Sequence, residues 1–206
     1  MQNKMKQTQL EKQLANKTTC KNYLDKCIAQ LWAGQNPEAI KMLQQYLCVF
    51  PSDGEAHYYL GNAFFNARDL DKAIHHLRRA LALRNDKTQI LFIIAYVAYE
   101  QGNLQIGCDA LEMVVAMEPD NQCALSCLGS FLVTMGQRLG LAIDCLRKAV
   151  QLESYDQGAW YYLGMALTTQ GNIAEAVQAY ERVIEIDSDS RHANNARCRL
   201  AEVHLN

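Results

Sequence analysis

The chain has 206 residues, of which 50% are hydrophobic and 20% charged, and its formal net charge at pH 7 is -2. A nearly neutral chain lacks the positive excess that general binding to nucleic acid or to anionic membranes requires, so both classes are excluded. With only three prolines and 11 glycines, the composition favours an all-α domain over short strands joined by tight turns.

The N-terminal segment, residues 1–19, is polar and has no apolar core of the length that a secretory signal needs. We expect this segment to be helical or disordered, and the protein to be cytoplasmic. The longest apolar run, residues 90–99, is far shorter than the roughly 20 residues of a membrane-spanning helix. The eight cysteines are irregularly spaced, which predicts reduced thiols and no disulfide framework.

A period of 34 residues organises the chain from residue 20 to residue 190. Position eight of each period is small and position 24 is large in every case. The small residues are Cys27, Gly61, Ala95, Gly129 and Gly164, and the large ones are Leu43, Leu77, Leu111, Leu146 and Tyr180. Helices whose axes approach to about 8–10 Å need such gaps for the side chains of their partner. Each period is therefore predicted to form two antiparallel helices.

The repeats have the following predicted boundaries. The five units span 20–53, 54–87, 88–121, 122–156 and 157–190, and residues 191–206 form a C-terminal capping helix. Four units carry glycine at position fifteen, where the first helix must end in a conformation that glycine adopts most easily. These glycines are Gly34, Gly102, Gly136 and Gly171.

This pattern resembles the tetratricopeptide repeat (TPR) family, whose unit is a 34-residue helix-turn-helix. The fifth unit matches the family pattern best, through Trp160, Leu163, Gly164, Leu167, Ala176 and Tyr180. The resemblance implies a right-handed superhelical solenoid in which the first helix of each unit lines a concave groove.

The first unit departs from this pattern, because Lys26 and Gln30 stand where apolar residues are expected. Its apolar stripe, which includes Leu24, Leu31 and Trp32, is turned toward the groove side. We expect something to cover it: the N-terminal segment, a client polypeptide, or a second copy in a homodimer formed through the N-terminal segment and the first unit.

The groove positions supply the candidate binding site, which is rich in tyrosine and almost free of charge. The candidate residues are Tyr58, Tyr59, Asn62, Phe92, Tyr96, Tyr99, Ser130, Tyr161, Tyr162 and Met165. Tyrosine suits a half-wet wall because its ring is apolar and its tip is polar. Such a groove is predicted to bind a segment of another protein; the alternative is that the rings belong to the core.

No catalytic motif is present, so the sequence predicts a protein that is not an enzyme and needs no cofactor. Cys123 and Cys127 lie four residues apart and could share a metal or form a redox pair, but no third ligand is near them in sequence. A basic cluster in unit two is interpreted as a solvated face in preference to an anion site. It consists of His75, His76, Arg78, Arg79 and Arg84.

The sequence is compatible with three functions. The favoured one is a non-enzymatic adaptor that binds a polypeptide segment in the groove. The chain is also similar to the TPR chaperones of type III secretion, through its polar N-terminal segment, its degenerate first unit and the stretch 47–49. That resemblance implies a cytosolic chaperone of secreted translocator proteins. The third is a metal- or redox-linked protein that uses Cys123 and Cys127.

Overall fold

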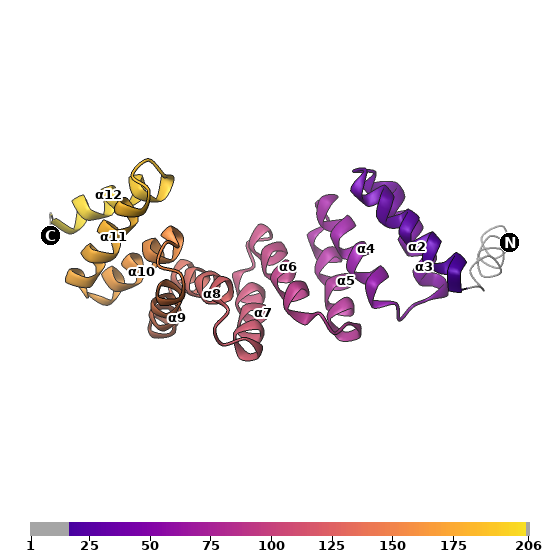
Figure 1. Cartoon of the computed structure of the whole chain (residues 1–206), viewed down its shortest axis with the longest axis horizontal. Helices are drawn as coiled ribbons and strands as arrows, with labels where there is room; N and C mark the ends of the chain where they lie inside the picture. Colours follow the sequence, from indigo (N-terminus) through magenta and orange to yellow (C-terminus); the bar gives the residue numbers. More distant parts are fainter. Residues whose placement is uncertain (1–16, 205–206) are drawn as a thin grey trace. The chain divides into compact units, whose positions relative to one another are not determined.

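The computed structural model describes residues 17–204, which form eleven α-helices joined by short turns and contain no strand (Figure 1). The helices are α2 (Lys17–Trp32), α3 (Asn36–Val49), α4 (Gly54–Asn66), α5 (Leu70–Leu83), α6 (Lys87–Glu100), α7 (Leu104–Met117), α8 (Gln122–Met135), α9 (Leu139–Leu152), α10 (Gln157–Gln170), α11 (Ile173–Ile186) and α12 (Arg191–His204). The predicted all-α fold is confirmed. The expectation for residues 1–16 lies outside the described residues.

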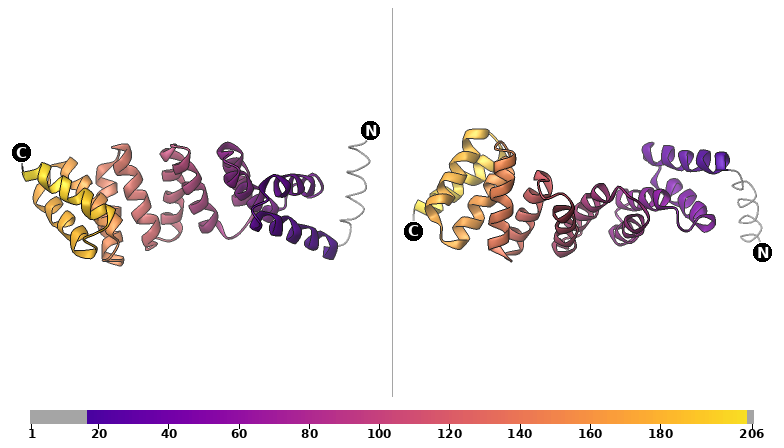
Figure 2. Two further views of the ribbon diagram at one scale, coloured as in Figure 1. Left: turned by 90° about the horizontal axis from the view of Figure 1, so that it is seen from above. Right: turned by 60° about the horizontal axis from the view of Figure 1, so that its bottom comes forward.

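The helices form two compact bodies. The N-terminal body contains α2 to α6, and the C-terminal body contains α7 to α12. Within them the closest pairs are consecutive helices, α4 with α5, α8 with α9 and α10 with α11, and α12 packs along α11 (Figure 2). No helix within residues 17–204 has both the length and the apolar surface needed to cross a membrane.

Small residues mark the places where paired helices touch. A Cβ atom added at Gly61 of α4 would lie 2.8 Å from Cγ of Leu77 on α5, and one added at Gly164 of α10 would lie 2.6 Å from the Tyr180 ring on α11. Gly129 of α8 makes the same close approach to Leu146 of α9. The predicted packing of small residues against large ones is therefore confirmed for these three pairs.

Polar side chains fix the starts of several helices. Asp53, Asn121 and Asp156 each accept hydrogen bonds from backbone N–H groups in the first turn of α4, α8 and α10. The buried Tyr46 of α3 also donates its hydroxyl to Asp53, at 2.9 Å. This bond ties α3 to the start of α4, because one carboxylate serves both the cap and the neighbouring helix.

The turns between paired helices use the left-handed backbone region. Gly34, Gly102, Gly136 and Gly171 have φ between 64° and 88°, which confirms their predicted role. Arg68 occupies the same position of the second unit and also has a positive φ of 63°. An L-residue is strained there. The Arg68 guanidinium pairs with Glu100 of α6, at 2.9 Å.

We expect Arg68→Gly to be more stable than Arg68→Ala by about 1 kcal/mol, because only glycine adopts this backbone conformation without strain. Both variants lose the exposed ion pair, whose loss costs at most about 1 kcal/mol and cancels in the comparison. Urea unfolding followed by circular dichroism measures the difference. Equal unfolding midpoints for the two variants would show that the turn at Arg68 is unstrained.

The first unit buries most of its apolar stripe. Leu24 and Leu31 are buried, and α2 packs against α3 and α4. The expectation that this stripe needs a further cover is therefore wrong for these two residues, since they are covered within the chain. Trp32, at the end of α2, is 78% exposed and is the part of the stripe that remains in solvent.

Candidate functional site

None of the ten candidate site residues is buried. Tyr96 and Tyr99 are each 55% exposed. The remaining eight are half-buried. The buried core consists mainly of leucine, alanine, isoleucine and valine side chains at other positions, so the alternative that the candidate rings belong to the fully buried core is wrong.

In the N-terminal body, six aromatic side chains of α4 and α6 are half-buried or exposed, and we call this set the N-terminal aromatic face. It comprises Tyr58, Tyr59, Phe65, Phe92, Tyr96 and Tyr99. Phe65 of α4 and Tyr96 of α6 meet edge to face, with ring centroids 5.4 Å apart. Tyr58 and Tyr59 form a second edge-to-face pair at 5.2 Å. Within each pair the two rings are steeply inclined to each other, and both pairs are partly exposed to solvent.

Two arginines at the border of this face are already paired. Arg84 binds Asp86 through two hydrogen bonds of 2.6 Å, and its guanidinium lies 5.0 Å from the centre of the Tyr58 ring. The hydrogen bonds from Arg84 lower the pKa of Asp86. At the other border Arg68 holds Glu100. These pairs offset the charges that a charged ligand would need to meet.

The tyrosine hydroxyls of the face act as hydrogen-bond donors. Gln89 donates its side-chain amide to the Tyr58 hydroxyl at 3.4 Å, so the hydrogen of that hydroxyl is directed to another acceptor. Burial and the nearby Glu55 carboxylate raise the pKa of Tyr59. Its hydroxyl therefore remains protonated throughout the neutral range. The half-buried Asn62 adds an amide on the same helix.

In the C-terminal body, Tyr161 and Tyr162 form a further edge-to-face pair at 5.5 Å on α10. Tyr161 also lies 5.5 Å from the ring of His192 on α12. Ser130 of α8 donates its hydroxyl to the carbonyl of Cys127 in its own helix, at 2.8 Å. Its hydroxyl hydrogen is thus used within α8, and the tyrosine pair is the stronger candidate for binding.

Met165 lines a pocket of about 570 Å³ formed by α10, α11 and α12. Its other lining residues are Thr168, Thr169, Ile173, Tyr180, Arg199, Glu202 and Val203. Arg199 pairs with Glu202 at 3.0 Å, and hydrogen bonds to Tyr161 and Glu202 raise the pKa of Arg199. Arg199 was not predicted as a site residue from the sequence, where residues 191–206 are assigned only to a capping helix. Continuing the 34-residue register places Arg199 at the position of Met165, which would have identified it.

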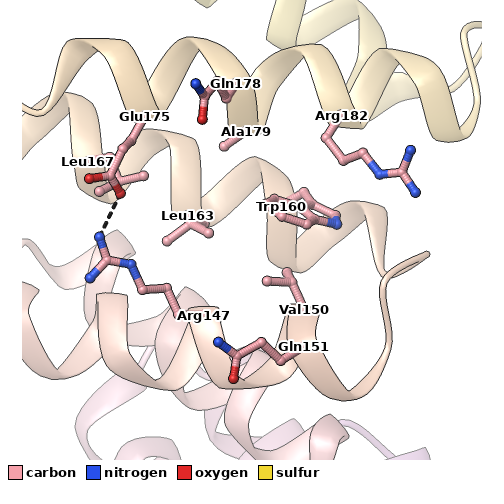
Figure 3. A pocket seen from close by; sticks show the side chains of 10 residues that line it. All are labelled: Arg147, Val150, Gln151, Trp160, Leu163, Leu167, Glu175, Gln178, Ala179 and Arg182. Atoms are coloured by element: carbon pink, nitrogen blue, oxygen red, sulfur yellow. Dashed lines mark hydrogen bonds and ion pairs between the residues drawn. The ribbon is translucent and has the colours of Figure 1, made fainter.

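A second pocket, of about 480 Å³, lies between α9, α10 and α11 (Figure 3). Trp160, Leu163 and Leu167 supply its apolar surface. The ion pair between Arg147 and Glu175, at 2.6 Å, lies at one side of it. This pocket was not predicted from the sequence, where Trp160, Leu163 and Leu167 are identified only as positions of the family pattern.

The basic cluster of unit two does not form one surface. His75, Arg78 and Arg79 are exposed, as the solvated-face interpretation predicts. His76 instead turns toward α4, where its Nδ1 lies 3.0 Å from Nδ1 of His57. Arg84 belongs to the border of the aromatic face.

Cys123 and Cys127 both lie on α8 and are free thiols. Cys123 is exposed and Cys127 half-buried, and burial followed by the charge of Cys123 raises the pKa of Cys127. A raised thiol pKa keeps the sulfur protonated and poorly reactive. Within the described part of the chain, no group of three or more candidate ligands is arranged to hold a metal ion.

Curated relatives share the repeat over much of the chain. Tetratricopeptide repeat protein 7A of Homo sapiens is 27% identical over 127 residues, 62% of this chain and 15% of that protein. DnaJ homolog subfamily C member 3 of Gallus gallus is 20% identical over 190 residues, 90% of this chain and 37% of that protein. The chain thus spans well under half the length of these relatives.

Solved structures show the same fold. YrrB, described as a TPR protein with an unusual peptide-binding site, has a TM-score of 0.75 at 17% identity and covers 85% of this chain and 90% of its own. MamA of Desulfovibrio magneticus RS-1 has a TM-score of 0.71 at 23% identity, with 84% and 97% covered. Family models described as tetratricopeptide repeat match residues 24–89, 63–121 and 158–190. The chain belongs to the tetratricopeptide repeat family and has its helical solenoid fold.

Proposed function

We propose that the protein is a non-enzymatic scaffold that binds a polypeptide segment on the N-terminal aromatic face. TPR proteins are in general scaffolds for protein interaction. The observation that carries the proposal is the partial or high exposure of six aromatic side chains on α4 and α6. A contiguous apolar surface in solvent is typical of an interaction site, and tyrosines often dominate the binding energy of such sites.

The pairing of nearby charges supports binding through apolar area and neutral hydrogen bonds. Arg84 is held by Asp86 and Arg68 by Glu100. An acidic ligand therefore gains little from its charge, and salt of a few tenths molar does not screen apolar contacts as it screens ion pairs. We expect the affinity for a bound segment to stay nearly constant between 50 mM and 300 mM salt.

The test is selection of binding peptides from a displayed random library, followed by affinity measurement on variants of the full chain. The double variant Tyr96→Ala, Tyr99→Ala should weaken the selected peptides by about 2–4 kcal/mol, which is roughly 30- to 1000-fold. Tyr155→Ala is the matched control, because Tyr155 is 70% exposed and lies in the C-terminal body. It should leave the affinity unchanged.

A second variant locates the binding surface. If the selected peptides tolerate the double variant and lose affinity in Tyr162→Ala, the site lies on α10 of the C-terminal body. Affinity that falls steeply with salt while both variants bind normally would contradict the proposal and point to a charged surface. No observation favours the chaperone, homodimer or redox alternatives over this scaffold.

A further inference from the structure

We propose that the segment bound by the N-terminal aromatic face is proline-rich and is held in the polyproline II conformation. This inference rests on the proposed function and specifies its ligand. Three features of the face carry it: the paired border charges, the hydroxyl donors and the perpendicular ring pairs.

The charges at the face disfavour an acidic ligand. Arg84 is engaged by both Asp86 oxygens and by the Tyr58 ring, and Arg68 is engaged by Glu100. An acidic ligand would have to displace these partners and approach the exposed Glu55 carboxylate beside Tyr59, which is unfavourable. A ligand without acidic groups where it touches the face is therefore favoured.

The tyrosine hydroxyls of the face favour a ligand that accepts hydrogen bonds. The Tyr58 hydroxyl already receives a hydrogen bond from Gln89, so it has a hydrogen to donate. The raised pKa of Tyr59 keeps its hydroxyl a donor as well. A polyproline II backbone makes no internal hydrogen bonds, so its carbonyls are open to such donors, and proline brings no N–H that would need an acceptor.

The same argument disfavours a helical ligand. The backbone carbonyls of an α-helix are bonded within the helix, apart from its last turn. A helix laid on the face would cover the hydroxyls of Tyr58 and Tyr59 and offer them no backbone acceptor. A buried donor without a partner weakens binding.

The ring geometry suits a small, rigid apolar ring. Phe65 and Tyr96 are inclined at 62°, and Tyr58 and Tyr59 at 75°. Each pair therefore forms an apolar corner with two walls, into which a pyrrolidine ring can pack. Proline-rich segments dock on aromatic surfaces in this manner, and their stiffness reduces the entropy lost on binding.

The experiment uses the full chain and two labelled, uncharged peptides of equal length: nine prolines, and an alanine- and leucine-rich amphipathic helix. Fluorescence polarisation measures both affinities. We expect the proline peptide to bind at least tenfold more tightly than the helical one. Tyr96→Ala should weaken it at least tenfold. Tyr58→Phe, which removes the hydroxyl and keeps the ring, should weaken it about 2- to 10-fold, while Tyr155→Phe should have no effect.

The outcomes separate this inference from the proposed function. If the proline peptide fails to bind while library-selected peptides still depend on Tyr96 and Tyr99, the inference is overturned and the scaffold function stands. If no selected peptide depends on these tyrosines, both fail. Binding of the proline peptide that is insensitive to Tyr96→Ala and Tyr58→Phe also overturns the inference, because it would take place elsewhere.

Discussion

Gly164→Leu should lower the free energy of unfolding of the C-terminal body by about 3 kcal/mol relative to Gly140→Leu. A Cβ atom at Gly164 would lie 2.6 Å, 2.8 Å and 3.0 Å from three atoms of the Tyr180 ring. That ring is 1% exposed and packs 6.2 Å from Tyr161, and on its other side it lines the pocket between α10, α11 and α12. To admit a leucine, the ring must leave its packed position or α10 and α11 must separate.

Gly140 is the matched control for this substitution. It lies in α9 of the same body, and a Cβ atom there would have no neighbour within 4 Å. Both substitutions replace glycine with leucine in a helix, and the gain in helix propensity, about 1 kcal/mol at an interior position such as Gly164, is smaller at Gly140, the second residue of α9. Urea unfolding of both variants measures the difference. Equal stability of the two would mean that the contact between α10 and α11 is loose.

Acidification from pH 7 to pH 4 should destabilise the N-terminal body by about 2 kcal/mol through His57 and His76. Nε2 of His57 faces the carbonyl of Pro51 at 3.1 Å and must carry a hydrogen. Nδ1 of neutral His57 is then an acceptor, and the opposing Nδ1 of His76 must donate. A second proton on His57 places two N–H groups against each other and breaks the bond.

Stability falls on acidification because the pKa values of both histidines are lowered in the folded protein. Burial lowers the pKa of His57, and burial together with the charges of His57, His75 and Arg79 lowers the pKa of His76 from 6.5 to about 4. The hydrogen bond to the Pro51 carbonyl and, more weakly, the charge of Asp53 oppose the lowering of the His57 pKa. The unfolded chain therefore binds more protons between pH 6.5 and pH 4. The contribution to stability is fully present above pH 6.5 and is lost as the pH falls toward 4.

Urea unfolding at several pH values tests this prediction, with hydrogen exchange of α4 and α5 to locate the loss. The double variant His57→Gln, His76→Gln should have a shallower dependence of stability on pH in this window. His75→Gln is the control, because His75 is an exposed neighbour on the same helix as His76. A double variant as acid-sensitive as the wild type would show that other groups cause the effect.

Periodicity alone determined much of the fold. The small residues at position eight predicted where α4 meets α5 and where α10 meets α11, since a close approach of helices demands the same residue size in every unit. The glycines at 34, 102, 136 and 171 predicted left-handed turns, because few other residues adopt that conformation at little cost. The position of the candidate tyrosines outside the fully buried core was also predicted, because the core positions were already occupied.

Other features were decided only by the tertiary structure. Arg68 adopts a left-handed turn without glycine, and His76 turns inward from a cluster that looks solvated in sequence. Arg199 lines the pocket between α10, α11 and α12, and Trp160 lines the pocket between α9, α10 and α11. In each case the environment of the side chain comes from a neighbouring helix, as in the contact between residues 57 and 76. A local pattern specifies which face a residue occupies, but the atoms it meets depend on how that face packs against residues distant in sequence.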